Sequence, residues 1–302
     1  MRICSLLPSA TEILYALGLG DSVVGVTHEC DYPQEAAKKP ALIRPRVYPH
    51  AKPGEIDRKV AELVGRGESI YAVDAELLVS LAPGLIVTQD LCHVCAASPD
   101  DLATALTRFA KIPRVLSLTP RSPGDVWGDI CKVGEATGRR DEAKSLATKI
   151  AARVDGIARI AQGKDARPRM LCLEWLEPFY VAGHWVPEMV ALAGGEDALG
   201  RAGEPSFRVT AEEIARRNPD VIVVMPCGYN LRRTVEEFEW ARVPESWRDI
   251  SAIRERRVYA VDANSYFSRP GPRLADGVEM LARILHPEEF GMRWGEGAIH
   301  RL

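Results

Sequence analysis

The chain has 302 residues, a net charge of −3 and an isoelectric point near 6.1. Its 46% hydrophobic and 27% charged residues are typical of a globular protein, and its length allows two ordinary domains. No basic field favours a nucleic-acid partner, and no apolar run approaches the roughly 20 residues that cross a bilayer. We therefore expect a monomeric globular protein without a membrane-inserted segment.

The N-terminal residues predict a short buried strand followed by a helix. A secretory signal has a basic start, an apolar stretch and a small-residue cleavage site, and residues 1–20 lack this order. The seven cysteines are compatible with a reducing compartment. Both observations predict a cytoplasmic location, or a periplasmic one if the chain was trimmed from a longer precursor.

Short apolar runs bounded by Gly, Pro or Asp recur through the first part of the chain. They cover residues 23–26, 70–73, 85–88 and 115–118. Such runs are typical of buried strands, and their alternation with helical patterns indicates a parallel sheet covered on both faces. We assign residues 1–121 to an N-terminal α/β lobe.

A long helical segment follows at residues 122–163. Ser122 and Pro123 provide an N-cap and a first-turn proline, and apolar residues then recur at helical spacing. Gly138 predicts a break, so the segment is expected to form two abutting helices. We interpret it as a backbone helix that joins two lobes.

A second α/β lobe is predicted over residues 164–302. Its clearest strands are residues 170–173, 221–224 and 258–261. The fold class that we predict is therefore α/β, with two Rossmann-like lobes that contain parallel sheets and are joined by a long backbone helix.

One motif occurs in both halves. Residues 74–87 and 210–223 each contain an N-capped short helix that ends near a proline and leads into a strand. Any helix-to-strand unit can look like this, but the equal position in each half favours structural duplication. Two such lobes predict a ligand cleft between them.

The sequence resembles a known family at several of these points. Residues 5–18, SLLPSATEILYALG, are similar to the start of the periplasmic binding proteins for cobalamin and iron chelates. The repeated motif, the central helix, the Gly194–Gly195 pair and residues 257–261 also fit this family. The resemblance covers nearly the whole chain, and the cobalamin-binding branch is the most similar. It implies that the protein binds a ligand and is not an enzyme. The implied ligand is cobalamin, or a related corrinoid or metal chelate, held in the interlobe cleft.

The resemblance also implies a membrane partner. In the transport members, one surface glutamate on each lobe docks into arginine pockets of an ABC permease, and Glu76 and Glu212 occupy the matching positions. The alternative is that both are acids stabilised by helix dipoles, at about 0.3–1 kcal/mol each. The absence of a signal peptide favours this alternative.

Loops that leave the carboxyl ends of parallel strands line the ligand crevice of open α/β sheets. In the first lobe, such loops follow the predicted strands at residues 23–26 and 85–88. The candidate ligand-binding residues of this lobe are Ser9, His28, Glu29, Cys30 and Gln89.

Cysteine and histidine gather in the same two loops. Cys92 and Cys95 have the spacing of a metal-binding or redox pair, Cys30 could add a third thiolate, and His28 or His93 could complete a Cys₃His site for zinc or another soft metal. His28, His93 and Cys30 are also candidate axial ligands of a corrin cobalt or a heme iron. Reduced cysteines that pack beside the cleft, or a redox switch, remain open alternatives.

The second lobe places aromatic residues near its predicted strand ends. Trp and Tyr combine a large apolar face with a polar group, which suits a flat macrocycle, although ordinary core packing is the alternative. A polar loop at residues 262–273 includes Asn264 and Arg273, which could bind the ligand or fix the loop. The candidate ligand-binding residues of this lobe are Trp175, His184, Trp185, Cys227, Tyr229, Tyr266 and Arg269.

A rival hypothesis is a metal-binding or chelatase-like enzyme that acts on a tetrapyrrole through the Cys/His site. It depends on an analogy of overall architecture alone. The sequence contains no nucleophile-elbow, phosphate-loop or His-Glu-x-x-His motif. The binding function is therefore favoured.

Overall fold

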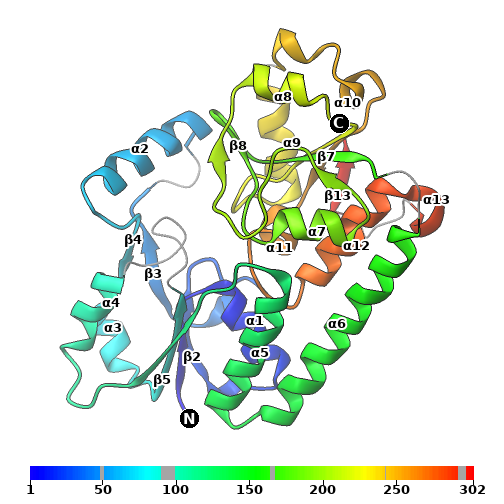
Figure 1. Cartoon of the computed structure of the whole chain (residues 1–302). Helices are drawn as coiled ribbons and strands as arrows, with labels where there is room; N and C mark the ends of the chain where they lie inside the picture. The colour runs from blue at the N-terminus through cyan, green and yellow to red at the C-terminus, as the bar shows by residue number, and fades with distance from the viewer. Residues whose placement is uncertain (48–50, 90–98, 164–166, 242, 292–296) are drawn as a thin grey trace. The chain divides into compact units, whose positions relative to one another are not determined.

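The computed structural model describes residues 1–47, 51–89, 99–163, 167–241, 243–291 and 297–302. Two compact units are present. Unit 1 comprises Met1–Pro120 with Asp125–Thr148, and unit 2 comprises Arg121–Gly124 with Lys149–Leu302. The predicted two-lobed α/β fold is confirmed, and both units share the linking helical segment (Figure 1). The domain borders at residues 121 and 163 stay a prediction.

Unit 1 contains a six-stranded sheet in the order β4-β3-β2-β1-β5-β6. All neighbouring strands are parallel except β3 and β4 at one edge. The sheet is therefore mixed, with the predicted parallel pairing throughout except at the edge strand β4. The strands are β1 (Ile3–Ser5), β2 (Val23–Thr27), β3 (Ala41–Pro45), β4 (Tyr71–Val73), β5 (Leu85–Gln89) and β6 (Arg114–Leu118).

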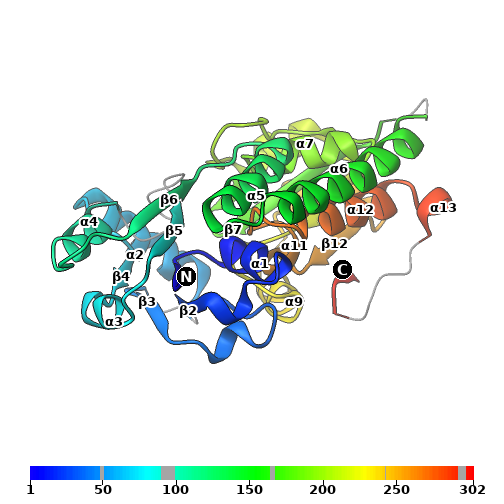
Figure 2. The ribbon, with the colours of Figure 1, turned by 90° about the horizontal axis from the view of Figure 1, so that it is seen from below.

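Helices cover both faces of this sheet. In the two views of Figures 1 and 2, α3 and α4 lie on one face, and α1 and α5 lie on the other. Buried residues of β1, β3 and β5 form one apolar cluster with Leu78 of α3 and Leu102 of α4. The helices of unit 1 are α1 (Pro8–Ala16), α2 (Pro53–Gly65), α3 (Ala75–Ser80), α4 (Pro99–Leu106) and α5 (Pro123–Thr137).

Unit 2 contains a sheet in the order β10-β8-β7-β11-β12-β13, with β9 paired to β7. Its centre, β7-β11-β12, is parallel, whereas β8, β10 and β13 pair in antiparallel fashion. Residues 177 and 178 alone connect β7 to β8, and a parallel crossover needs a dozen residues or more. The strands are β7 (Arg169–Leu176), β8 (Phe179–Val181), β9 (Glu196–Asp197), β10 (Phe207–Arg208), β11 (Val221–Val224), β12 (Val258–Val261) and β13 (Ile299–Arg301).

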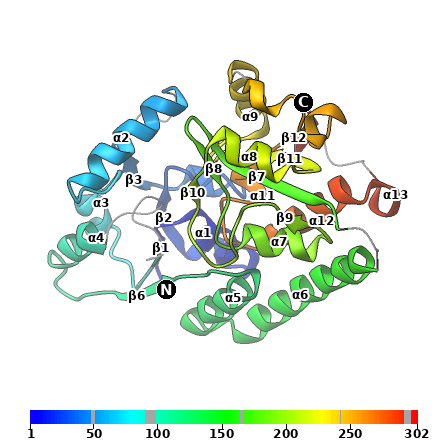
Figure 3. The ribbon, with the colours of Figure 1, turned by 45° about the horizontal axis from the view of Figure 1, so that its top comes forward.

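Three helical segments of unit 2 lie side by side: α7, α12 and the C-terminal part of α6 (Figures 2 and 3). On the sheet, Ile214 of α8 and Trp247 belong to one apolar core cluster with residues of β7 and β11. The helices are α6 (Arg140–Gln162), α7 (Val186–Leu192), α8 (Ala211–Arg217), α9 (Leu231–Trp240), α10 (Ser251–Arg254), α11 (Ala263–Tyr266), α12 (Leu274–Leu285) and α13 (Pro287–Phe290).

The linking segment is broken where the sequence predicted it. Helix α5 ends at Thr137, α6 begins at Arg140, and Gly138 between them has a φ of 74°. This left-handed conformation costs glycine little and other residues more, which explains why the break occurs at Gly138.

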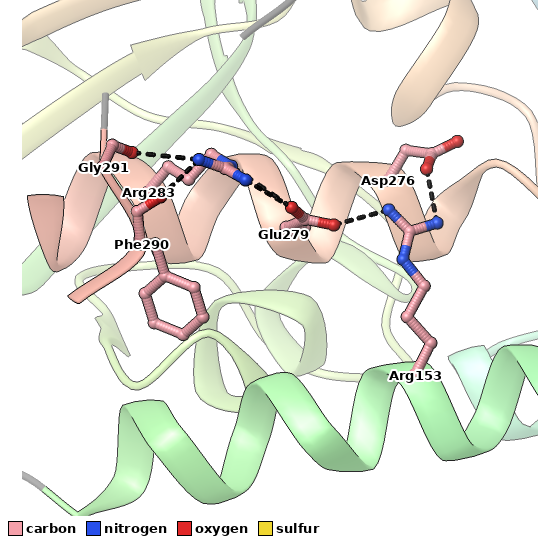
Figure 4. Close-up of polar contacts among 6 residues, drawn as sticks. All are labelled: Arg153, Asp276, Glu279, Arg283, Phe290 and Gly291. Carbon is pink, nitrogen blue, oxygen red and sulfur yellow. Dashed lines mark hydrogen bonds and ion pairs between the residues drawn. The ribbon is translucent and has the colours of Figure 1, made fainter. Parts of the chain in front are cut away.

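An ion-pair network fastens the second half of α6 to α12 (Figure 4). Arg153 Nη1 lies 2.6 Å from Asp276 Oδ1, and its Nη2 lies 2.5 Å from Glu279 Oε2. The other oxygen of Glu279 accepts from Arg283, 2.7 Å away. Burial alone would raise the pKa of Glu279, but hydrogen bonds from both arginines outweigh it, and the pKa is lowered. The network therefore holds the second half of α6 within unit 2.

The motif that occurs in both halves lies in a similar strand order in the two sheets. In unit 1, β5 lies between β1 and β6, and in unit 2, β11 lies between β7 and β12, with every pair parallel. Helix α3 precedes β5 and is capped by Asp74, and α8 precedes β11 and is capped by Thr210. Both units therefore repeat one arrangement around their central strands.

The repeat also includes a strained residue before each proline. Ala82 precedes Pro83 with a φ of 43°, and Asn218 precedes Pro219 with a φ of 44°. Asparagine tolerates this left-handed region better than alanine does. The Asn218 side chain also accepts a hydrogen bond of 2.8 Å from the backbone N–H of Ser251.

These equivalent positions predict opposite effects of two substitutions. Ala82 is exposed, so Ala82→Asn should raise the free energy of unfolding by about 0.5–1 kcal/mol through relief of backbone strain. Asn218→Ala should lower it by about 1–2 kcal/mol, because strain increases and a hydrogen bond is lost. Urea denaturation measures both values, and a loss of stability in Ala82→Asn would contradict the argument.

Candidate functional site

The carboxyl ends of β1, β2 and β5 lie at one edge of the sheet in unit 1, because β1 pairs in parallel with both neighbours. The segments that follow β1 and β2 meet there. Thr11 Oγ1 donates to Ser5 Oγ at 2.8 Å and lies 3.1 Å from Cys30 Sγ. The segment after β2 thus contacts α1 directly, whereas residues 90–98 after β5 lie outside the described residues, so the expected convergence of those two loops stays a prediction.

Three of the predicted ligand-binding residues of unit 1 are buried at this edge. Cys30 is 2% exposed, and its sulfur lies within 3.3 Å of Thr27 Oγ1 as well as contacting Thr11. Ser9 and Gln89 are also buried. In this conformation the Cys30 thiol packs among hydroxyl groups inside the unit.

His28 and Glu29 are the accessible candidates at the same edge, with side chains that are 27% and 41% exposed, and His28 Nε2 lies 3.9 Å from Glu29 Oε1. His28 Nδ1 lies 3.0 Å from the carbonyl oxygen of Ile43. Because a carbonyl only accepts, a neutral imidazole carries its proton on Nδ1 and keeps a lone pair on Nε2. The ring centroid lies 5.7 Å from that of Tyr71, whose hydroxyl donates to Glu29 at 3.4 Å. These contacts fix the orientation of the His28 ring, as is typical of histidines that coordinate a metal ion.

The predicted metal site is not tested by these contacts. Cys92, His93 and Cys95 lie outside the described residues, so the Cys₃His site with Cys30 and His28 stays a prediction. Among the residues that the structure describes, no three or more His, Cys, Asp or Glu side chains are grouped so as to hold a metal ion.

Two aromatic candidates of unit 2 meet at the carboxyl edge of its parallel strands. Trp175 is the next-to-last residue of β7, which extends three residues beyond the predicted strand, and Tyr229 follows β11. The ring centroids are 5.4 Å apart at an interplanar angle of 62°, an edge-to-face contact. Trp175 is partly exposed and its Nε1 donates to the carbonyl of Glu177 at 3.1 Å.

Tyr229 is almost fully buried, and Arg233 holds it. The hydroxyl accepts a 2.7 Å hydrogen bond from Arg233 Nη2, and the guanidinium carbon lies 3.7 Å from the ring centroid. Burial raises the pKa of Tyr229 to about 12, although the Arg233 charge opposes the shift. Arg233 was missed by the sequence analysis, since nothing in the pattern of α9 distinguishes it from its neighbours.

His184 and Trp185 form a second aromatic pair, with ring centroids 5.5 Å apart. Trp185 is 6% exposed, and its Nε1 donates to the carbonyl of Phe267 at 2.7 Å. His184 has a φ of 53° and is fixed by backbone hydrogen bonds to Gly203 and Glu204. Burial, followed by the charge of Arg121, lowers the pKa of His184, which favours the neutral imidazole.

The segment after β12 connects these two pairs. The N–H of Asn264 donates to the carbonyl of Tyr229 at 3.0 Å, and Phe267 accepts from Trp185 as described. Tyr266 lies under the guanidinium of Arg273 at 5.8 Å, and Arg269 is buried. Cys227, the remaining candidate, is exposed. Whether the carboxyl edges of the two units share one cleft stays a prediction.

The two proposed docking glutamates occupy equivalent and exposed positions. Glu76 is the second residue of α3, and Glu212 is the second residue of α8. Glu213 rather than Glu212 completes the capping box with Thr210. Glu212 is thus not required for the cap, although the docking role itself stays a prediction.

Residues 3–265 match the periplasmic binding protein family. The chain belongs to this family. It is 30% identical to an uncharacterized ABC transporter substrate-binding lipoprotein, YvrC of Bacillus subtilis, over 96% of this chain and 81% of that protein. It is 23% identical to the vitamin B12-binding protein of Photorhabdus laumondii, over 95% and 88% of the two chains.

Solved structures give the same fold. The periplasmic heme-binding protein RhuT of Roseiflexus sp. RS-1 has a TM-score of 0.70 at 26% identity, over 94% of this chain and 97% of that one. The periplasmic vitamin B12 binding protein BtuF of Vibrio cholerae has a TM-score of 0.68 at 22% identity, over 94% and 96%. The similarity to BtuF, at 22% identity, is evidence for the fold alone.

The family consists of substrate-binding proteins, and these relatives are named as periplasmic proteins or as a lipoprotein. Their names point to work outside the cytoplasm, so they do not support the cytoplasmic location predicted from the sequence. In the described part of the chain, no helix has the length and apolar character needed to span a membrane.

The different burial of the cysteines predicts different reactivity. Cys227 is exposed, whereas Cys4, Cys30 and Cys172 are buried, and burial raises the pKa of Cys4 to about 12. A short pulse of N-ethylmaleimide on the native protein should modify Cys227 at least about tenfold faster than Cys30. Peptide mass spectrometry measures both rates, and labelling in denaturant is the control. Equal rates in the native protein would mean that the Cys30 thiol is accessible.

Proposed function

We propose that this chain is the substrate-binding component of an ABC transporter and that its ligand is a flat metal chelate of the tetrapyrrole class, such as cobalamin or heme. The main support is the aromatic pair Trp175 and Tyr229, held at the carboxyl edge of unit 2 with the Trp175 ring partly exposed. Relatives named for vitamin B12 and for heme support the ligand class.

Stacking alone is not sufficient for useful affinity. Covering ~200 Å² of apolar ligand face contributes about 5 kcal/mol, from which the cost of ordering the complex must be subtracted. A coordinate bond to the metal can provide the remainder. His28 is the residue of unit 1 suited to this, because the carbonyl of Ile43 fixes its Nδ1 proton and leaves the Nε2 lone pair available.

The proposal includes a location and a partner. A substrate-binding component works outside the cytoplasm, as the names of the relatives indicate for those proteins. Glu76 and Glu212 are the proposed contacts with the permease, since both are exposed at equivalent positions of the repeat. The chelatase-like alternative depends on cysteines outside the described residues, and no observation favours it.

Titration of the purified protein with hydroxocobalamin and, separately, with heme tests this function. At least one of them should bind in a 1:1 ratio with a Kd of about 1 μM or lower, with a change in its visible spectrum. Trp175→Ala should weaken binding about tenfold through the loss of aromatic contact. Calorimetry measures both affinities.

Trp240→Ala is the matched control, because Trp240 is 79% exposed at the end of α9 and has no part in the proposed site. The Trp240→Ala variant should bind the ligand with the same affinity as the unchanged protein. Absence of binding to both ligands, or an equal loss in the two tryptophan variants, would contradict the proposed function.

A further inference from the structure

We propose that Arg233 is a positioning residue for ligand binding, which fixes Tyr229 and thereby the orientation of the Trp175 ring. The inference rests on the proposed function, because it takes the Trp175 ring as the surface that receives the ligand. Arg233 itself is assigned no contact with the ligand.

The geometry places Arg233 firmly beside Tyr229. Arg233 is the third residue of α9, and its backbone N–H donates to the capping side chain of Asn230 at 3.0 Å. Its guanidinium bonds the Tyr229 hydroxyl at 2.7 Å, lies over the ring at 3.7 Å and reaches Glu237 Oε1 at 3.8 Å. A cation held against a largely buried ring and hydroxyl interacts strongly, because water competes little there.

Tyr229 is suited to support a neighbouring ring and poorly suited to meet a ligand. It is 3% exposed, and its backbone carbonyl is fixed by the N–H of Asn264. Trp175 contacts it edge to face, and the indole N–H is already bonded to Glu177. The Trp175 ring therefore offers its apolar surface, and Tyr229 with Arg233 determines how that surface is tilted.

Loss of the guanidinium has a specific consequence. The buried hydroxyl of Tyr229 loses its 2.7 Å donor and the ring loses the cation against it. A buried polar group without a partner is costly, so the Tyr229 side chain should reorient toward a new partner. The edge contact with Trp175 then changes, and the ligand meets a ring that is no longer preorganised.

The chain offers a matched control in the adjacent residue. Arg232 pairs with Glu236 at 3.4 Å, just as Arg233 pairs with Glu237 one residue later. The Arg232 side chain is 87% exposed, compared with 21% for Arg233. Arg232→Gln therefore removes an equivalent charge and helix ion pair without affecting Tyr229.

The binding experiment is a double-mutant cycle. Arg233→Gln and Arg232→Gln are each made in the unchanged protein and in Trp175→Ala, and affinity is measured for hydroxocobalamin and for heme. Arg233→Gln should weaken binding about tenfold in the unchanged protein and leave it unchanged in Trp175→Ala. Arg232→Gln should have no effect in either background. Tyr229→Phe, which keeps the ring and removes the hydroxyl, should give a smaller loss.

A second readout needs no ligand. In protein labelled with 5-fluorotryptophan, the ¹⁹F signal of Trp175 is identified by its absence in Trp175→Phe. Arg233→Gln should shift or broaden this signal, whereas Arg232→Gln should leave it in place. A general loss of stability would not single out this one tryptophan.

Unchanged affinity together with an unchanged Trp175 signal in Arg233→Gln would overturn the inference. An equal loss of affinity with and without Trp175 would also overturn it, since the effect would not pass through that ring. If the unchanged protein binds neither ligand, the proposed function fails, and the fluorine signal still decides whether Arg233 orients Trp175.

Discussion

Parallel pairing of β1 with β2 and of β7 with β11 is the constraint on which the rest of the structure depends. It directs the carboxyl ends of neighbouring strands to one edge of each sheet, so segments far apart in sequence meet there. In unit 1 this brings Cys30 against Thr11, and in unit 2 it brings Trp175 against Tyr229. The candidate site residues follow from this topology.

The two units repeat one arrangement of a capped helix that leads into a central parallel strand, but they carry different side chains at their carboxyl edges. Unit 1 presents an imidazole, fixed by a backbone carbonyl, after its strand β2. In unit 2 the corresponding neighbour of the first strand is β8, a hairpin partner of β7, and this hairpin holds Trp175 at the sheet edge. The two units therefore present different groups at their carboxyl edges, an imidazole in unit 1 and a partly exposed aromatic ring in unit 2.

Features that depend on a few neighbouring residues could be predicted from the sequence, and features that depend on distant partners could not. The caps at Asp74 and Thr210 and the break at Gly138 depend on single residues and their immediate neighbours, and the structure contains all three. The strands β3 and β8 and the antiparallel direction of β4 were missed, because short strands and strand direction depend on partners that periodicity does not reveal. The burial of Cys30 and the contact of Arg233 with Tyr229 depend on side-chain packing, which no spacing pattern records.

Hydrogen–deuterium exchange with and without bound ligand tests the central claim most directly, namely that the carboxyl edges of the sheets receive the ligand. The account predicts slower exchange, on adding hydroxocobalamin or heme, in peptides that cover residues 27–31, 173–177 and 226–231, with helix α2 unchanged as the internal reference. Protection confined to other segments, with these three peptides unaffected, would contradict it.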